Sequence, residues 1–197
     1  YGWEMVLITH EILKTYKPLN NLTKNSFLEN YEENCSNLLL EYSWDPIKLQ
    51  QCLDNSRAFQ IKKDLKKWIS LHQPFIEVVS FIKYAQNKGY KIGIISTKGK
   101  RFTSEILSNL NLLPELIFGY ESGSKVDIIT NLSINYEIKG FIEDRRTTLS
   151  NILENDQTKF ISCYLAEWGY LKNTDKIGLP QEIKLLKIKN LKELVAN

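Results

Sequence analysis

From Pro74 onward, short apolar runs of strand type alternate with segments of helical periodicity, and this alternation constrains the fold more than any other feature. The predicted strands cover 90–96, 116–118, 138–143, 160–165 and 185–188. The predicted helices cover 74–88, 102–111, 124–132 and 147–155, followed by a C-terminal helix capped by Asn190. Strands separated by helices predict right-handed βαβ crossovers and a parallel sheet with helices on both faces. We therefore expect a doubly wound α/β fold.

Residues 1–72 have a different pattern, with helical periodicity and no convincing strand. Ile61, Leu65 and Trp68 repeat at the spacing of one helix face. Asp45-Pro46 predicts a helix start, because aspartate caps a helix N-terminus and proline fits the first helical position. The sequence therefore predicts a helical part followed by an α/β part.

Composition excludes several classes of protein. The 197 residues carry 26 Lys+Arg and 23 Asp+Glu, a net charge of +3, with 43% hydrophobic residues. This balance is ordinary for a globular chain, is too apolar for a disordered one, and lacks the basic stripe of a nucleic-acid binder. No apolar stretch approaches the ~18 residues of a membrane helix, and no secretory signal is visible. Three widely spaced cysteines suggest neither a disulfide framework nor a zinc site. We expect a cytoplasmic protein without nucleic-acid or membrane partners, of undetermined oligomeric state.

Polar residues follow the first predicted strand of the α/β part. Ligands of doubly wound sheets bind beyond the carboxyl ends of the strands, so these positions are candidates for function. Ser96, Thr97 and Lys98 combine hydroxyl groups, backbone N–H groups and a cation, which suit an oxyanion or a phosphate. An ordinary polar turn explains them equally well. Arg101 follows the same loop and could reach a phosphate or carboxylate.

Charged residues occupy the next two strand ends. Lys125 lies in the first turn of a predicted helix, where a cation opposes the helix dipole unless it reaches an anion. Glu143 and Asp144 end a strand as adjacent carboxylates, and such oxygen ligands suit Mg²⁺. Lys125 could instead face solvent, and the two acids could form a surface salt-bridge cluster with Arg145 and Arg146.

The ordered set of a hydroxyl, a lysine and paired acids on successive strand ends resembles the haloacid dehalogenase-like superfamily of hydrolases. Its second motif corresponds to Ile94-Ile95-Ser96, its third to Lys125, and its fourth to Phe141-Ile142-Glu143-Asp144. The local sequences Pro74-Phe75 and Trp168-Gly169-Tyr170 are similar to those of phosphoglycolate-phosphatase-like members. The resemblance covers residues 74–170.

The resemblance implies a Rossmann-like core with a helical cap inserted near its start. Residues 1–15 would begin the core and lead into the cap, residues 16–72 would form the α-helical cap, and residues 73–197 would form the rest of the core. The implied activity is that of a phosphatase which cleaves a small phosphorylated metabolite through an aspartyl-phosphate and uses Mg²⁺.

The same resemblance implies a role for each candidate residue. Ser96 and Lys125 would be catalytic, with Ser96 hydrogen-bonded to a phosphoryl oxygen and Lys125 stabilising negative charge. Asp144, more strongly than Glu143, would hold Mg²⁺. Further phosphate or substrate contacts would come from the loop residues Thr97, Lys98 and Arg101.

One departure from the family pattern affects the mechanism. The family's first motif, an apolar strand ending in Asp-x-Asp-Gly, does not occur in these residues. Tyr1 to Met5 is similar to the stretch that follows that motif, so the resemblance implies a nucleophilic aspartate just upstream of Tyr1. The 197 residues alone would then be inactive.

Two alternatives remain open at this point. The chain could be a degenerate, non-catalytic relative that binds a phosphorylated ligand or a partner. It could also be a different doubly wound domain, such as a receiver-like module, which likewise uses acids, a hydroxyl and a lysine around a phosphorylated aspartate. The long helical segment at residues 1–72 argues against the receiver-like module.

Overall fold

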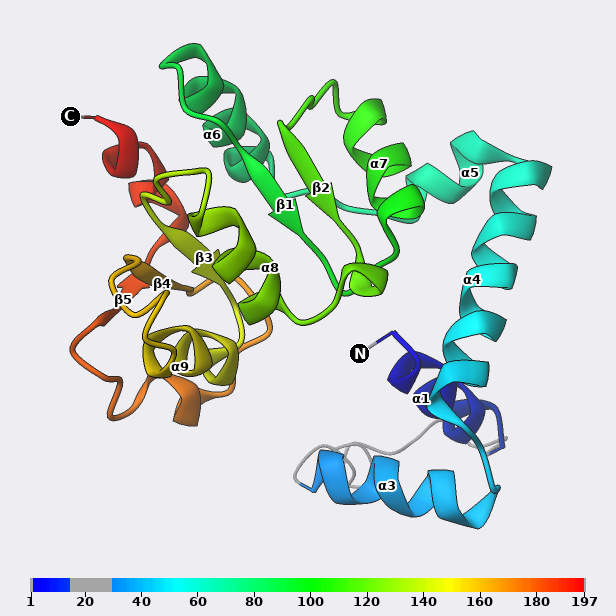
Figure 1. Ribbon diagram of the computed structural model, residues 1–197. Coiled ribbons are helices and arrows are strands. Elements are labelled where there is room, and N and C mark those ends of the chain that lie inside the picture. The colour runs from blue at the N-terminus through cyan, green and yellow to red at the C-terminus, as the bar shows by residue number, and fades with distance from the viewer. Residues whose placement is uncertain (1, 15–29, 197) are drawn as a thin grey trace. The chain divides into compact units, whose positions relative to one another are not determined.

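The computed structural model describes residues 2–14 and 30–196, and it is a mixed α/β structure with small parallel sheets (Figure 1). The chain divides into two compact units, Tyr1–His72 and Gln73–Asn197. The assignment of residues 1–15 to a core and of residues 16–72 to a cap stays a prediction.

The first unit contains helices and no strand among its described residues. Its helices are α1 (Glu4–Lys14), α3 (Tyr31–Glu41), α4 (Pro46–Lys63) and α5 (Leu65–Ser70). Its buried core joins one residue of α1 to residues of α3 and α4: Leu7, Cys35, Leu38 and Leu49.

The predicted start of a helix at Asp45-Pro46 is confirmed. The Asp45 carboxylate accepts the backbone N–H groups of Ile47 and Lys48 at 2.6 and 3.3 Å. The helical repeat through Leu65, by contrast, is divided between two helices. Asp64 takes an extended conformation (φ −163°, ψ 93°), ends α4 and caps α5. The helix is therefore interrupted at Asp64, whose side chain caps α5, although the apolar repeat continues across this residue.

The described residues of the second unit form five short parallel strands in two sheets. The strands are β1 (Gly93–Ile95), β2 (Leu116–Phe118), β3 (Phe141–Glu143), β4 (Cys163–Ala166) and β5 (Ile183–Leu186). One sheet has the order β1-β2 and the other has the order β3-β4-β5. The expected alternation of strand and helix is confirmed, although four of the five strands have other bounds than the sequence predicts.

Helices and 3₁₀ turns precede, connect and follow these strands. They are α6 (Ile76–Asn87), α7 (Lys100–Asn109), η1 (Tyr120–Ser122), α8 (Lys125–Ser133), α9 (Arg146–Glu154), η2 (Asn173–Lys176) and η3 (Ile188–Val195). Gly89 follows α6 with φ +85°, the left-handed conformation expected of a glycine at a helix C-terminus. The predicted cap at Asn190 is wrong, because η3 already begins at Ile188 after Lys187.

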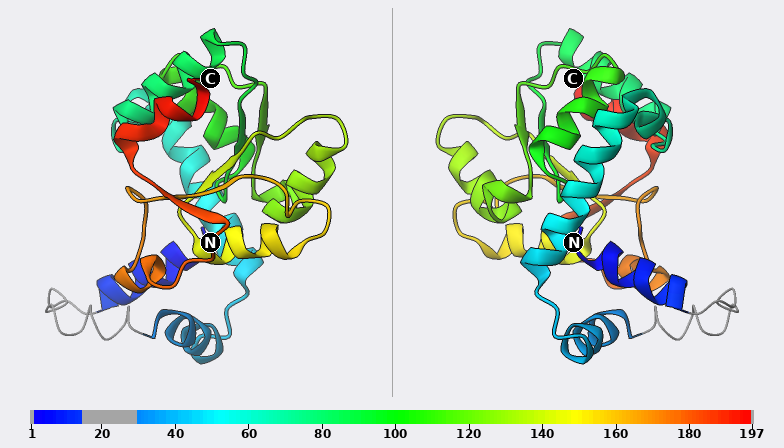
Figure 2. Two further views of the ribbon diagram at one scale, coloured as in Figure 1. Left: turned by 90° about the vertical axis from the view of Figure 1, so that its left-hand side faces the viewer. Right: turned by 90° about the vertical axis from the view of Figure 1, so that its right-hand side faces the viewer.

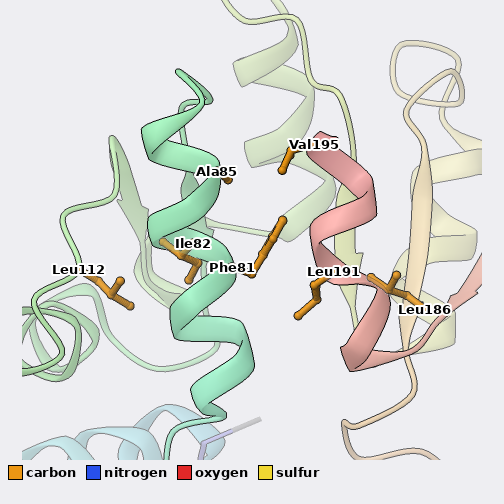
Figure 3. Close-up of a cluster of buried hydrophobic side chains, with 7 residues drawn as sticks. All are labelled: Phe81, Ile82, Ala85, Leu112, Leu186, Leu191 and Val195. Atoms are coloured by element: carbon orange, nitrogen blue, oxygen red, sulfur yellow. The ribbon is translucent and has the colours of Figure 1, made fainter. Parts of the chain in front are cut away.

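Two apolar clusters cover the two faces of the strands. The α6 face cluster joins α6, β5 and η3 and comprises Phe81, Ile82, Ala85, Leu112, Leu186, Leu191 and Val195 (Figure 3). The α9 face cluster joins α8, α9, β4 and β5 and comprises Ile129, Leu149, Ile152, Ile161, Cys163, Leu165 and Ile183. Figure 2 shows α6 and η3 on one side of the strands and α8 on the other. The strands therefore form a middle layer with helices on both sides.

Among residues 2–14 and 30–196, no helix has the length and apolarity that crossing a membrane requires.

Candidate functional site

Lys125 and Glu143 form an ion pair at the carboxyl ends of the strands. Lys125 is the first residue of α8, which follows β2 and η1, and Glu143 is the last residue of β3. The side chains are 19% and 7% exposed. The pair brings the end of β3 to the loop that follows β2, so the two strands end on the same side of the layer. Of the two readings of Lys125 left open by the sequence, contact with a carboxylate or an anion and exposure to solvent, the structure shows contact with a carboxylate.

The start of α8 holds Lys125 in this position. The Ser124 hydroxyl caps the helix by accepting the Asp127 N–H at 3.1 Å and donates to the Asp127 carboxylate at 2.6 Å. The N-terminus of a helix favours negative charge, so a lysine there is mildly unfavourable by itself. Its attraction to Glu143 offsets this cost.

The Glu143 carboxyl group is the buried acid of the site. Burial raises its pKa above the ordinary glutamate value, while the Lys125 ammonium group acts in the opposite direction and Asp144 adds to the rise. The carboxylate also accepts the Arg145 backbone N–H at 3.3 Å. Glu143 is therefore held by two donors and shares its charge with Lys125.

Asp144 is half-buried next to this pair. One of its carboxylate oxygens accepts the Tyr170 backbone N–H at 3.1 Å, which links the end of β3 to the loop after β4. Gly169 allows this approach, because a Cβ atom at that position would lie 2.1 Å from the Asp144 Cβ atom. The Trp168-Gly169-Tyr170 segment therefore positions Asp144, a contact that the strand pattern did not predict.

Replacing Gly169 by alanine is expected to displace Asp144 and to lower the free energy of unfolding by about 1–3 kcal/mol, the usual cost of overpacking. Gly93→Ala is the matched control, because a Cβ atom at Gly93 meets no atom within 4 Å. Chemical denaturation of both variants checks the expectation. Equal stability of the two variants would contradict the close contact with Asp144.

The loop after β1 is organised by its own hydrogen bonds. The Ser96 hydroxyl accepts the Lys98 backbone N–H at 3.0 Å, and the Ser96 N–H donates to the Phe118 carbonyl at 2.9 Å. At the start of α7, the Lys100 N–H donates to the Glu121 carboxylate at 2.8 Å. The two amides of Lys98 and Lys100 are thus engaged, so an anion in this loop would compete with Ser96 and Glu121 for them.

Gly119 makes the Glu121 contact possible, since a Cβ atom there would lie 2.2 Å from the Lys100 nitrogen. The sequence analysis did not identify Glu121. Glu121 lies outside α7, so nothing in the sequence near Lys100 indicates that its carboxylate accepts the Lys100 N–H. The indication in the sequence was Gly119, a glycine that allows a close approach of the two segments.

The other candidate residues of the sequence analysis are more exposed than Glu143. Thr97 is exposed on the loop after β1, and Lys98 is half-buried there. Arg101 is exposed on α7, and its guanidinium group lies 6.0 Å from the ring centre of Phe102. Arg146 donates to the Ile177 and Gly178 carbonyls at 2.7 and 2.5 Å.

Two acidic side chains of the site could offer oxygen ligands to a cation, namely Glu143 and Asp144. The described part of the chain contains no group of three or more His, Cys, Asp or Glu residues placed to hold a metal ion. Mg²⁺ sites often use only one or two protein carboxylates and complete the coordination with water and phosphate. Asp144 fits such a role better than Glu143, whose charge Lys125 already balances.

Ser96 shares the carboxyl end of the strands with these residues. Among the described residues, no hydrogen bond or ion pair joins Ser96 to Lys125, Glu143 or Asp144. The candidate site therefore consists of a connected group, Lys125 with Glu143 and Asp144, and a separate hydroxyl loop at the end of β1.

Comparisons with models of protein families, with curated proteins and with solved structures find no match for this chain.

Proposed function

We propose that the carboxyl ends of β1 and β3 bind the phosphoryl group of a small phosphorylated metabolite, in a haloacid dehalogenase-like phosphatase with a helical cap. The observation that carries the proposal is the half-buried Lys125, paired with the buried Glu143 next to a second acid at the end of a parallel strand. A cation and two carboxylates at that edge suit an anion that arrives together with a metal ion.

Each residue has a part in the proposed binding. Lys125 holds one phosphoryl oxygen and balances the negative charge that builds up around it. Ser96 turns its hydroxyl from the Lys98 N–H to a second oxygen and donates to it. Asp144, with Glu143 beside it, offers oxygen ligands for Mg²⁺. That ion would neutralise the phosphate and orient it for in-line attack.

Hydrolysis along the family's route needs an aspartate nucleophile. The 197 residues contain no Asp-x-Asp pair at the end of an apolar strand. The 197-residue chain is therefore expected to bind the phosphorylated ligand without turnover, and phosphatase activity requires a nucleophile from another segment.

The non-catalytic alternative shares the binding site and differs in turnover. A degenerate relative would bind phosphate and Mg²⁺ but would not hydrolyse the phosphorylated ligand, even with further segments of the protein present. A receiver-like module, the other alternative, forms a long-lived acyl phosphate with acetyl phosphate. The free cysteines of the described residues, Cys35, Cys52 and Cys163, suit the reducing cytoplasm in which we place the protein.

Calorimetric titration with inorganic phosphate in the presence of Mg²⁺ tests the site. Lys125→Met and Ser96→Ala are each expected to weaken phosphate binding roughly tenfold, or about 1.4 kcal/mol. Asp144→Asn is expected to remove the Mg²⁺ dependence of binding.

Lys139→Met is the matched control. Lys139 also pairs with a glutamate, Glu137, but both side chains are exposed. Phosphate affinity that is equal in the wild type, Lys125→Met and Ser96→Ala would remove both residues from the site. Because Lys125→Met also affects folding, a loss of phosphate affinity in that variant supports the site only when Ser96→Ala, which breaks no ion pair, weakens binding as well.

A further inference from the structure

The strand layer of the second unit is interrupted between β1 and β3. β1 pairs with β2, and β3 pairs with β4, while no strand of the described residues pairs with the other edge of either one. Figure 1 shows β1 and β3 in the same unit without a strand drawn between them. Each of these two strands therefore has one open edge.

The open edges present backbone groups that can be identified from the register. In a parallel ladder, alternate residues direct their N–H and C=O groups to the same neighbour. Ile92 and Ser96 bond to the β2 side through the Ile92 carbonyl and the Ser96 N–H. Gly93 and Ile95 therefore direct their N–H and C=O groups away from β2.

The same argument holds for β3. The Phe141 N–H donates to the Ser162 carbonyl at 2.9 Å, on the β4 side. Ile142 is the next residue, so its N–H and C=O groups point away from β4. The backbone groups of Gly93, Ile95 and Ile142 form the open strand position.

Both edges lie in one layer. Ile94 of β1 and Ile142 of β3 pack against the same α6 face cluster. Ile95 of β1 and Phe141 of β3 pack against the same α9 face cluster. One pair of helical layers therefore covers both strands from both sides.

Both edges also run in the same direction. β1 is parallel to β2, and the Lys125–Glu143 ion pair brings the end of β3 to the loop that follows β2. A strand between β1 and β3 would therefore run parallel to both and would join the two sheets into one.

We infer that the open strand position binds an extended, apolar polypeptide segment from outside these 197 residues, by parallel strand addition between β1 and β3. The two open edges supply hydrogen-bond partners to both sides of the segment. The two apolar clusters require apolar side chains on both of its faces, as in buried parallel strands. Proline is excluded, because a central strand needs its N–H groups. This inference does not depend on phosphate binding.

Hydrogen exchange measured amide by amide tests the inference on the 197-residue chain. Without a peptide, the amides of Gly93, Ile95 and Ile142 should exchange faster than those of Ile94 and Phe141, which face paired strands. The probe is an acetylated, amidated peptide of about five alternating valine and isoleucine residues between lysines. Its addition should slow exchange at Gly93, Ile95 and Ile142 roughly tenfold or more.

Two controls separate strand addition from nonspecific adhesion. The same peptide with every backbone nitrogen of its apolar residues methylated keeps its apolar side chains, but both of its edges lack N–H donors and are blocked by the methyl groups, so it should protect none of these amides. Gly93→Pro removes one N–H of the open edge and no ladder bond to β2, and it should weaken peptide binding roughly fivefold at nearly unchanged stability. Gly93→Ala keeps that N–H and should bind the peptide like the wild type.

Three results would overturn the inference. In the first, the peptide protects neither edge, or it protects the amides of only one strand. In the second, Gly93, Ile95 and Ile142 are as well protected as Ile94 and Phe141 in the monomer without peptide. In the third, they become protected only at protein concentrations where dimers form, which would make a second copy of the chain the occupant.

Discussion

Leu165→Ala is expected to lower the free energy of unfolding of the α/β unit by about 3–4 kcal/mol, as large-to-small changes in a closed core do. Leu165 lies on β4 with 0% of its surface exposed, within the α9 face cluster. β4 is the middle strand of the sheet β3-β4-β5. The lost methyl groups would leave a cavity between the sheet and α9 that the two neighbouring strands cannot close.

Leu185→Ala provides the matched control. Leu185 pairs with Leu165 in the register of β4 and β5, and it is 40% exposed. Its truncation removes the same atoms from the same sheet and should cost less than half as much. Urea denaturation followed by the fluorescence of tryptophan in the α/β unit measures both variants. Similar losses for the two leucines would contradict the burial pattern of the sheet.

Lys125→Met is expected to lower the free energy of unfolding by about 3 kcal/mol at neutral pH. The substitution leaves the Glu143 carboxylate buried without its cationic partner, and breaking a buried pair from one side is strongly unfavourable. The double variant Lys125→Met/Glu143→Gln should recover most of this loss, because it removes the uncompensated charge as well. Equal stability of the single and double variants would contradict a charged pair.

The pH dependence of this effect has a definite sign. Burial holds the pKa of Glu143 above its ordinary value, while Lys125 lowers it. The folded protein thus binds this proton more tightly than the unfolded chain, so the contribution to stability is greatest below the ordinary glutamate pKa and is lost as pH rises through the raised value.

Without Lys125, the pKa of Glu143 rises further. The deficit of Lys125→Met should therefore be larger at pH 7 than at pH 4. Carboxyl carbon NMR titration of Glu143 in the wild type and in Lys125→Met measures the shift directly. A Glu143 pKa that is unchanged or lowered in the variant would contradict the attraction.

The sequence predicted elements of both units because their signals are local. The predicted strand at 116–118 coincides with β2, and Asp45-Pro46 starts α4 as expected. Strand bounds elsewhere differ by a few residues. The predicted strands 90–96 and 138–143 are longer than β1 and β3, which begin only at Gly93 and Phe141.

The candidate site was predicted in part. The position of Lys125 at a helix start and of Glu143 at a strand end could be read from the chain. Contact of Lys125 with an anion or a carboxylate was one of its two readings, but Glu143 was not identified as its partner. The engagement of the Lys100 amide could not be read from the chain, because Glu121 reaches α7 from a different turn. The Tyr170 N–H reaches Asp144 across a comparable gap in sequence.

The sequence by itself determined the parallel α/β architecture and the placement of polar residues at strand ends, because periodicity, caps and turns depend on neighbours along the chain. Only the tertiary structure decided that Lys125 neutralises Glu143 and that Gly169 admits Asp144. It also decided that the strands form two sheets with open edges at β1 and β3. These features depend on residues far apart in the chain, whose approach is set by the packing of helices on both faces of the strands.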